Sequence, residues 1–134
     1  MRGAAQAIEF YKKALGAVER FRIPGPDGMT IGHAELQIGK SIVMLADECA
    51  ESMSRSPATL NGTTCCFVLY VEDAAAVFQQ AVDAGATVLR PIEDKFYGDR
   101  TGIITDPFGH QWALMTHIED VSPDELQRRA KGQG

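Results

Sequence analysis

The chain has 134 residues, and 45% of them are hydrophobic, which is enough for one compact domain with a buried core. Its 18 acidic residues outnumber its 13 lysines and arginines, giving a formal net charge of −5. This charge argues against binding to nucleic acid, which requires a basic face, and against binding to an anionic membrane surface.

The sequence contains no candidate membrane span or disulfide framework. Its longest strongly apolar stretch, residues 65–71, is far too short to cross a bilayer, and charged residues interrupt the N-terminal region where a signal peptide needs an apolar core. The three cysteines are Cys49 and the adjacent pair Cys65 and Cys66, whose side chains point to opposite faces if they lie on a strand. An odd number of unpaired cysteines is typical of the reducing cytoplasm, where we expect the protein to reside.

The first half of the chain predicts a helix, a strand and a hairpin. Apolar residues recur at helical spacing over residues 4–17, and Gly16 supplies the stop. A strand is expected over "VERFRI", and a turn cluster follows at residues 24–28. Residues 29–37 and 40–46 then predict two strands joined at Gly39.

The second half follows the same plan. A strand over "TTCCFVLYV" precedes a helix at residues 74–84, which Asp73 can cap and Gly85 can end. A short strand "TVLRP", a loop "IEDKFYGD" and a hairpin around Gly109 come next. Residues 47–63 are expected to be a linker, and a capping-box pattern beginning at Ser122 predicts a terminal helix over residues 122–131.

Matching glycines indicate that the two halves are an internal repeat. Gly39 and Gly109 are 70 residues apart (109 − 39), as are Gly32 and Gly102, and the helix stops at Gly16 and Gly85 are 69 apart. The chain therefore predicts an α+β domain of two modules, residues 1–46 and 64–117. The second module has a strand before its helix, whereas the first begins at the helix.

Six segments in order resemble the vicinal oxygen chelate superfamily, which includes glyoxalase I, extradiol dioxygenases and bleomycin-resistance proteins. They are "AIEFYKKALGA", "HAELQIG", "MLAD", "FYGDRTG", "DPFGHQW" and "EDVSPDELQRR", and together they are most similar to the PhnB-like branch. The resemblance implies a single glyoxalase-like domain of two βαβββ modules. Their strands would form a curved mixed sheet around a concave cleft, with the helices outside. The strand that opens the first module in this superfamily is missing here.

Strand alternation assigns side chains to the cleft. His33, Glu35 and Gln37 are expected to face it on one strand, with Ala34, Leu36 and Ile38 toward the helices. The remaining cleft-facing residues are expected to be Ser41, Val43 and Leu45, then Cys66, Val68 and Tyr70, and finally Gln111, Ala113 and Met115. Trp112 and Leu114 are expected to face the helices.

The resemblance places three of the superfamily's metal-ligand positions at Val43 (or Met44, after a one-residue register slip), Cys66 and Ala113, and the fourth on the missing strand. Alanine and valine have no lone pair to donate, and a single thiol is a poor site for a hard cation. We therefore expect no metal cofactor.

Several cleft candidates have both a functional and a structural interpretation. His33 and Glu35 could be an acid–base pair, ligands of a relocated metal, or a polar pair on a wet face. Arg100 could bind a carboxylate or phosphate, or could order its loop with Asp99. Cys66 could be a nucleophile or a small filler. The candidate ligand-binding residues are His33, Glu35, Cys66, Tyr70, Tyr97, Arg100 and Gln111.

Two functions from different classes follow. The first is a protein without the usual metal site that binds or transforms an unidentified small molecule in the cleft. The second is a metal-dependent lyase, transferase or dioxygenase with an unusual ligand set. A purely structural or regulatory module is a third possibility. A homodimer is also expected, because a second copy could cover the sheet edge that the missing strand leaves unpaired.

Overall fold

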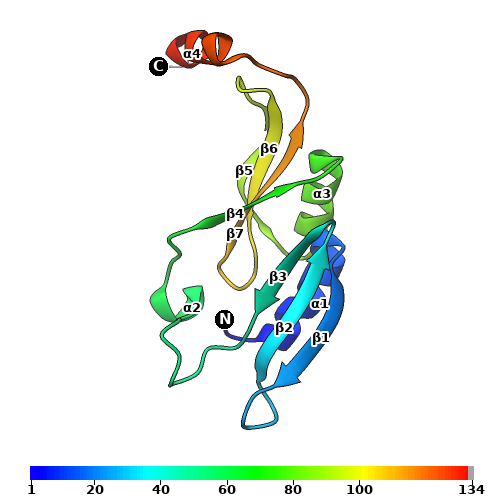
Figure 1. Cartoon of the computed structure of the whole chain (residues 1–134), viewed down its shortest axis with the longest axis vertical. Coiled ribbons are helices and arrows are strands. Elements are labelled where there is room, and N and C mark those ends of the chain that lie inside the picture. Colours follow the sequence, from blue (N-terminus) through cyan, green and yellow to red (C-terminus); the bar gives the residue numbers. More distant parts are fainter. Residues whose placement is uncertain (133–134) are drawn as a thin grey trace.

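The computed structural model describes residues 1–132, and Figure 1 shows an elongated molecule with α4 at one end. The helices are α1 (Ala4–Leu15), α2 (Pro57–Leu60), α3 (Ala74–Ala84) and α4 (Pro123–Gly132). The strands are β1 (Val18–Pro24), β2 (Ile31–Ile38), β3 (Ser41–Leu45), β4 (Cys66–Tyr70), β5 (Thr87–Asp94), β6 (Asp99–Thr105) and β7 (Gln111–His117). No helix within this part of the chain has the length and apolarity needed to cross a membrane.

The strands form two sheets, one from each half of the chain. In the first half, β1, β2 and β3 are antiparallel neighbours in that order. In the second half the order is β4-β7-β6-β5, and β4 runs parallel to β7 while the other pairs are antiparallel. This is the mixed α+β architecture that the repeat predicted, including the strand that opens only the second module.

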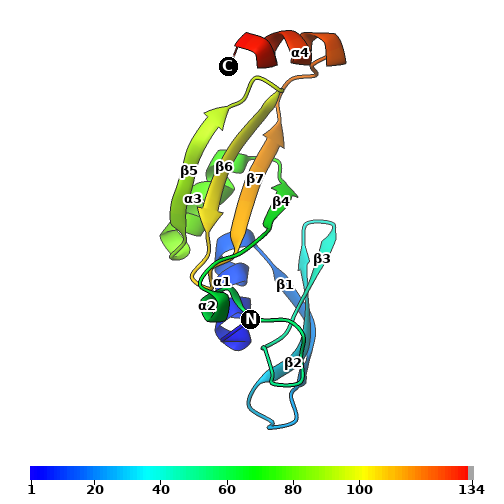
Figure 2. The same ribbon diagram turned by 90° about the vertical axis from the view of Figure 1, so that its left-hand side faces the viewer.

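The helices α1 and α3 cover one side of both sheets and pack against each other (Figures 1 and 2). The apolar stripe of α1 is buried, as its helical spacing predicted. The strand residues expected to face the helices are buried as well: Ala34, Leu36 and Ile38 on β2, and Trp112 and Leu114 on β7. Both halves therefore contribute to one hydrophobic core.

Asp106, from the "DPFGHQW" segment, ties the two halves together. Its carboxylate accepts the Tyr11 hydroxyl of α1 at 2.5 Å and the Trp112 indole N–H at 3.0 Å. It also accepts the backbone N–H groups of Phe108 and His110, so that it closes the turn before β7. The segment therefore does more than begin a turn, because Asp106 is buried where α1 meets β7.

Three local expectations need correction. The strand β3 is paired with β2 so that Leu36 lies opposite Val43 and Glu35 opposite Met44. Val43 therefore faces the helices, while Met44 shares the face of Glu35. The expected linker contains the short helix α2, capped by Ser56. Finally, only the middle of "IEDKFYGD", residues 95–98, is a loop, because β5 extends to Asp94 and β6 begins at Asp99.

Candidate functional site

The concave face of the second sheet is built from rows of side chains that lie beside one another across four strands. One row joins Arg90, Ile103, Ala113 and Val68, because these residues are cross-strand partners. The next row joins Glu93, Thr101, Met115 and Tyr70. A third contains Thr105, Gln111 and Cys66. Strand alternation places all of these side chains on the face of the sheet that points away from the helices.

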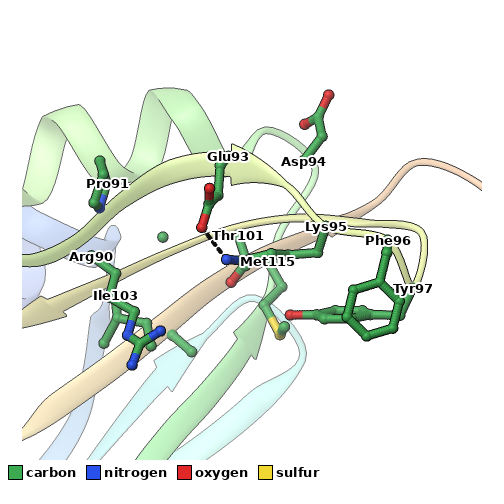
Figure 3. Close-up of a pocket in the computed structure, with 12 residues that line it drawn as sticks. Arg90, Pro91, Glu93, Asp94, Lys95, Phe96, Tyr97, Thr101, Ile103 and Met115 are labelled. Carbon is green, nitrogen blue, oxygen red and sulfur yellow. Dashed lines mark hydrogen bonds and ion pairs between the residues drawn. The ribbon is translucent and has the colours of Figure 1, made fainter. Parts of the chain in front are cut away.

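A cavity of about 590 Å³ lies over the first two rows. In Figure 3, Arg90 and Ile103 lie at one end of it, and Phe96 and Tyr97 of the β5–β6 turn lie at the other. Tyr97 extends back over the sheet toward Met115. The cavity therefore offers a mixed polar and apolar surface, with the Arg90 cation at one end and an aromatic wall at the other, and a few polar groups in a partly apolar cavity are typical of a small-molecule site.

Thr101 is the polar group that the fold leaves without a partner in this cavity. Its residue is only 5% exposed, it lines the cavity, and its hydroxyl makes no hydrogen bond within the described structure. Buried hydroxyls are nearly always hydrogen-bonded, because losing water without a replacement costs about 1–3 kcal/mol. The oxygen itself is covered, so a ligand in the cavity would reach it only after a neighbouring side chain moves aside.

The packing behind Thr101 fixes the position of this hydroxyl. The next residue, Gly102, faces the helix, and a Cβ there would lie 2.7 Å from the Phe78 ring of α3. The absence of a side chain lets α3 pack directly on β6. The strand β6 therefore has α3 packed on one face and the cavity on the other.

The charges around the cavity are largely compensated. Lys95 pairs with Glu93, and Asp94 pairs with Arg100, whose Nε donates to the Asp94 carboxylate at 2.6 Å. These pairs occupy both acids that line the cavity, and no ion pair of Arg90 is found among the described residues. Arg100 was expected to face the cleft, but alternation along β6 places it on the other face of the sheet from Thr101. Its guanidinium donates to Asp94 and not to Asp99.

The C-terminal helix holds the aromatic wall in place. Arg129 of α4 donates to the Phe96 carbonyl at 3.0 Å and pairs with Glu119 at 2.8 Å. The backbone N–H groups of Ile118 and Glu119 both donate to the Gly98 carbonyl. The tail after β7 therefore positions the turn that carries Phe96 and Tyr97.

A polar cluster lies beside the cavity on the same face. The Tyr70 hydroxyl donates to Asp99 at 2.8 Å, and His117 Nδ1 lies 2.9 Å from the other Asp99 oxygen. The second His117 nitrogen is 2.6 Å from Asp120. The hydrogen bonds to Asp120 and Asp99 raise the pKa of His117 above its ordinary value. The hydrogen bond to Asp99 likewise raises the pKa of Tyr70.

The other predicted residues lie apart from the cavity. His33 and Glu35 do share the face of β2 opposite the helices, with 3.6 Å between His33 Nε2 and Glu35 Oε1, but they belong to the first sheet. Cys66 and Gln111 face the concave side one row beyond the cavity. Partial desolvation raises the pKa of the Cys66 thiol, which does not favour the thiolate that a nucleophile needs. Of the predicted set, only Tyr97 lines the cavity, and the ligand-binding role of the set stays a prediction.

The residues present do not fit the superfamily's usual metal. With β3 in its observed register, the concave position predicted for Val43 belongs to Met44, opposite Glu35. A thioether, a thiol and an alanine, at Met44, Cys66 and Ala113, are a poor donor set for a hard divalent cation. Within residues 1–132, no three His, Cys, Asp or Glu side chains are grouped so that they could hold a metal ion.

Sequence reasoning missed Arg90 and Thr101, and it did not count Asp99 or His117 among the candidate ligand-binding residues. The alternation of Thr101 and Ile103 with Gly102 and Ile104 was the available signal, but it is visible only if β6 is begun at Asp99 rather than treated as a loop. Arg90 was harder to place, because β5 has irregular pairing between Val88 and Glu93, which breaks simple alternation.

The two-module α+β fold is shared with known proteins. The chain belongs to the Glyoxalase/Bleomycin resistance protein/Dioxygenase superfamily, whose family model matches residues 2–114. It is 46% identical to an uncharacterized protein of Mycobacterium bovis, over 98% of this chain and 88% of that protein.

Solved structures show the same fold. TioX from Micromonospora sp. ML1 is 26% identical, with a TM-score of 0.65 over 89% of this chain and 91% of that one. An Arabidopsis thaliana gene product is 32% identical, with a TM-score of 0.64 over 82% and 85% of the two chains. A glyoxalase/bleomycin resistance protein/dioxygenase family enzyme of Burkholderia phytofirmans has a TM-score of 0.67 over 88% and 93%, and at 18% identity it supports the fold alone.

Proposed function

We propose that this protein binds a small organic anion with an apolar, ring-containing body in the concave cavity, without the superfamily's usual metal. The observation that carries the proposal is the buried, unpartnered Thr101 hydroxyl on the cavity floor. Arg90 would hold the anionic group, and Tyr97 and Met115 would contact the apolar body.

The test is a binding screen with one- and two-ring aromatic carboxylates, each paired with its neutral amide, followed by calorimetry. The carboxylates should bind more tightly than the amides. Thr101→Val, which keeps the shape, should weaken binding by about three- to tenfold. Arg90→Gln should weaken carboxylate binding by about tenfold and leave amide binding unchanged.

Lys13→Gln is the matched control, because it removes an exposed cation from α1, on the outer side of the sheets. If Thr101→Val and Arg90→Gln behave like this control toward every ligand that binds, the cavity is not the site. Mass spectrometry of small molecules that copurify with the protein would identify the natural ligand directly.

The alternative function is a metal-dependent lyase, transferase or dioxygenase with an unusual ligand set. Its clearest candidate ligands are His33 and Glu35, which face the same side of β2. Metal analysis of protein purified without chelator separates the two proposals. Near-stoichiometric zinc, nickel, manganese or iron that is lost in His33→Ala would favour the metal enzyme.

Three further assignments are proposals of the same kind. The six motifs support the PhnB-like branch, and the three free cysteines support a cytoplasmic location. The homodimer is proposed because members of the superfamily commonly form dimers. Light scattering at tens of micromolar tests it, and a monomer there would refute it.

A further inference from the structure

His117, the last residue of β7, lies between two carboxylates. Its Nδ1 is 2.9 Å from Asp99 Oδ1, and its Nε2 is 2.6 Å from Asp120 Oδ1. A neutral imidazole has one N–H donor, whereas the imidazolium has two. Only the protonated ring can therefore donate to both carboxylates at once, so the observed arrangement is that of the charged His117.

The two carboxylates differ in exposure, and this decides which of them a neutral His117 would release. The Asp99 side chain is 9% exposed and also accepts the Tyr70 hydroxyl, whereas the Asp120 side chain is fully exposed. Loss of a donor costs a buried carboxylate more than an exposed one, because water replaces the donor at the surface. The single N–H of a neutral His117 would therefore stay on Asp99, and Asp120 would be released.

The other ionisable groups near His117 belong to different elements. Tyr70 lies on β4, and Glu72 and Lys40, which follow β4 and precede β3, line a cavity that His117 also lines. Glu119 in the tail is paired with α4. Within the described chain, the hydrogen bonds of the His117 ring go only to the two carboxylates above, so these two acids determine its charge.

Asp120 belongs to the tail, residues 118–122, which is fastened to the β5–β6 turn. The N–H groups of Ile118 and Glu119 donate to the Gly98 carbonyl at 2.9 and 3.0 Å. Tail and turn are in close contact there, because a Cβ on Gly98 would overlap the Glu119 carbonyl oxygen. The first residues of the tail are therefore held by the turn on one side and by His117 on the other.

The same turn carries the aromatic wall of the cavity. Phe96 and Tyr97 lie in it, and Tyr97 extends over the sheet toward Met115 in Figure 3. Arg129 of α4 donates to the Phe96 carbonyl at 3.0 Å, and Figure 2 shows α4 beyond the end of the second sheet. Because the tail and α4 together position the turn, a tail that loosens at its start would loosen the wall as well.

We propose that His117, Asp99 and Asp120 form a pH-sensitive latch, which holds the tail and the aromatic wall in place while His117 is charged. The effect on a ligand rests on the proposed function of the cavity, whereas the latch itself rests on the contacts above. The hydrogen bonds to Asp120 and Asp99 raise the pKa of His117, so release occurs as pH rises through this raised value. An anion in the cavity is therefore held more tightly on the acidic side of that value.

The latch is tested by amide exchange with water, measured by NMR at about pH 6 and about pH 9 and expressed as protection relative to an unfolded chain at the same pH. In the parent protein, protection of the Ile118 and Glu119 amides should fall by about two- to fivefold at the higher pH, as expected for the loss of one exposed ion pair. Amides in the middle of β7 should keep their protection.

Three variants separate the latch from a general effect of pH or charge. His117→Gln takes up no proton, so its tail protection should not depend on pH. Asp120→Asn should show the low tail protection already at the lower pH. Asp83→Asn is the matched control, because it removes the same charge from α3 and keeps an oxygen for the hydrogen bond from Gln79. The latch is refuted if His117→Gln keeps the pH dependence of the parent, or if Asp120→Asn behaves as Asp83→Asn does.

Calorimetry at the same two pH values distinguishes failure of the latch from failure of the proposed function. A carboxylate that binds in the cavity should bind about two- to fivefold more weakly to the parent at the higher pH, and equally at both pH values to His117→Gln. Equal binding to the parent at both pH values would overturn control of the cavity by the latch. If tail protection changes as expected but no carboxylate binds, the proposed function fails and the latch of the tail on the turn is confirmed.

Discussion

The hydrogen bond between Tyr11 and Asp106 offers a sharp test of how the two halves are joined. Tyr11→Phe removes the hydroxyl and leaves the ring, so it creates almost no cavity. Both residues are buried, and the bond is 2.5 Å long. Burial, and the Asp106 carboxylate beside it, raise the pKa of Tyr11 far above its ordinary value, so the hydroxyl remains a donor.

A hydrogen bond to a charged group contributes about 1.5–3 kcal/mol. Asp106 would keep its three other donors, so the loss should stay within this range rather than reach the cost of an unpaired buried charge. At about 3–4 °C per kcal/mol for a chain of this size, the melting temperature should fall by about 5–10 °C. Urea unfolding followed by the fluorescence of the single tryptophan, Trp112, measures the free energy directly.

Tyr97→Phe is the matched control, because it deletes a half-buried hydroxyl of the cavity wall and should change stability by less than about 0.5 kcal/mol. Asp106→Ala and the double variant with Tyr11→Phe complete a double-mutant cycle. Its coupling energy should be about 1.5–3 kcal/mol. If Tyr11→Phe costs no more than Tyr97→Phe, the bond does not hold the halves together.

Three further predictions address packing, pH and the cavity wall. Gly102→Ala should lower the free energy of unfolding, measured in urea, by about 1–3 kcal/mol, because the new methyl group would clash with the Phe78 ring. Gly62→Ala is the control and should change this free energy little, because nothing lies within 4 Å of the added methyl group. The raised pKa of His117 contributes stability that is fully present below its unfolded pKa and is lost as pH rises through the higher folded value. Between about pH 6 and 8, the melting temperature should therefore fall less in His117→Gln than in the parent protein. Arg129→Ala should accelerate amide exchange in the β5–β6 turn while leaving β7 unchanged.

The sequence by itself determined the elements whose side chains have a clear period. The helical stripe of α1, the glycine stops and the repeat offset predicted the module plan, because these signals depend only on neighbours along the chain. Alternation also placed His33 and Glu35 opposite the helices, since β2 reads as a clean series of apolar and polar residues. Trp112 and Leu114 were placed correctly for a related reason, because they form the bulkier set on β7.

Tertiary structure decided what local pattern left ambiguous. The strand β3 reads "SIVML", apolar on both faces, so only its pairing with β2 shows that Val43 faces the helices and Met44 does not. Arg100 was assigned to a loop, and the start of β6 turned it to the other face. The cluster of Tyr70, Asp99 and His117 joins β4 to the hairpin of β6 and β7, and the parallel pairing of β4 with β7 brings Tyr70 to the other two residues. The unpartnered hydroxyl of Thr101 has no sequence signal, because a missing hydrogen-bond partner is a property of the folded surroundings and not of the residue.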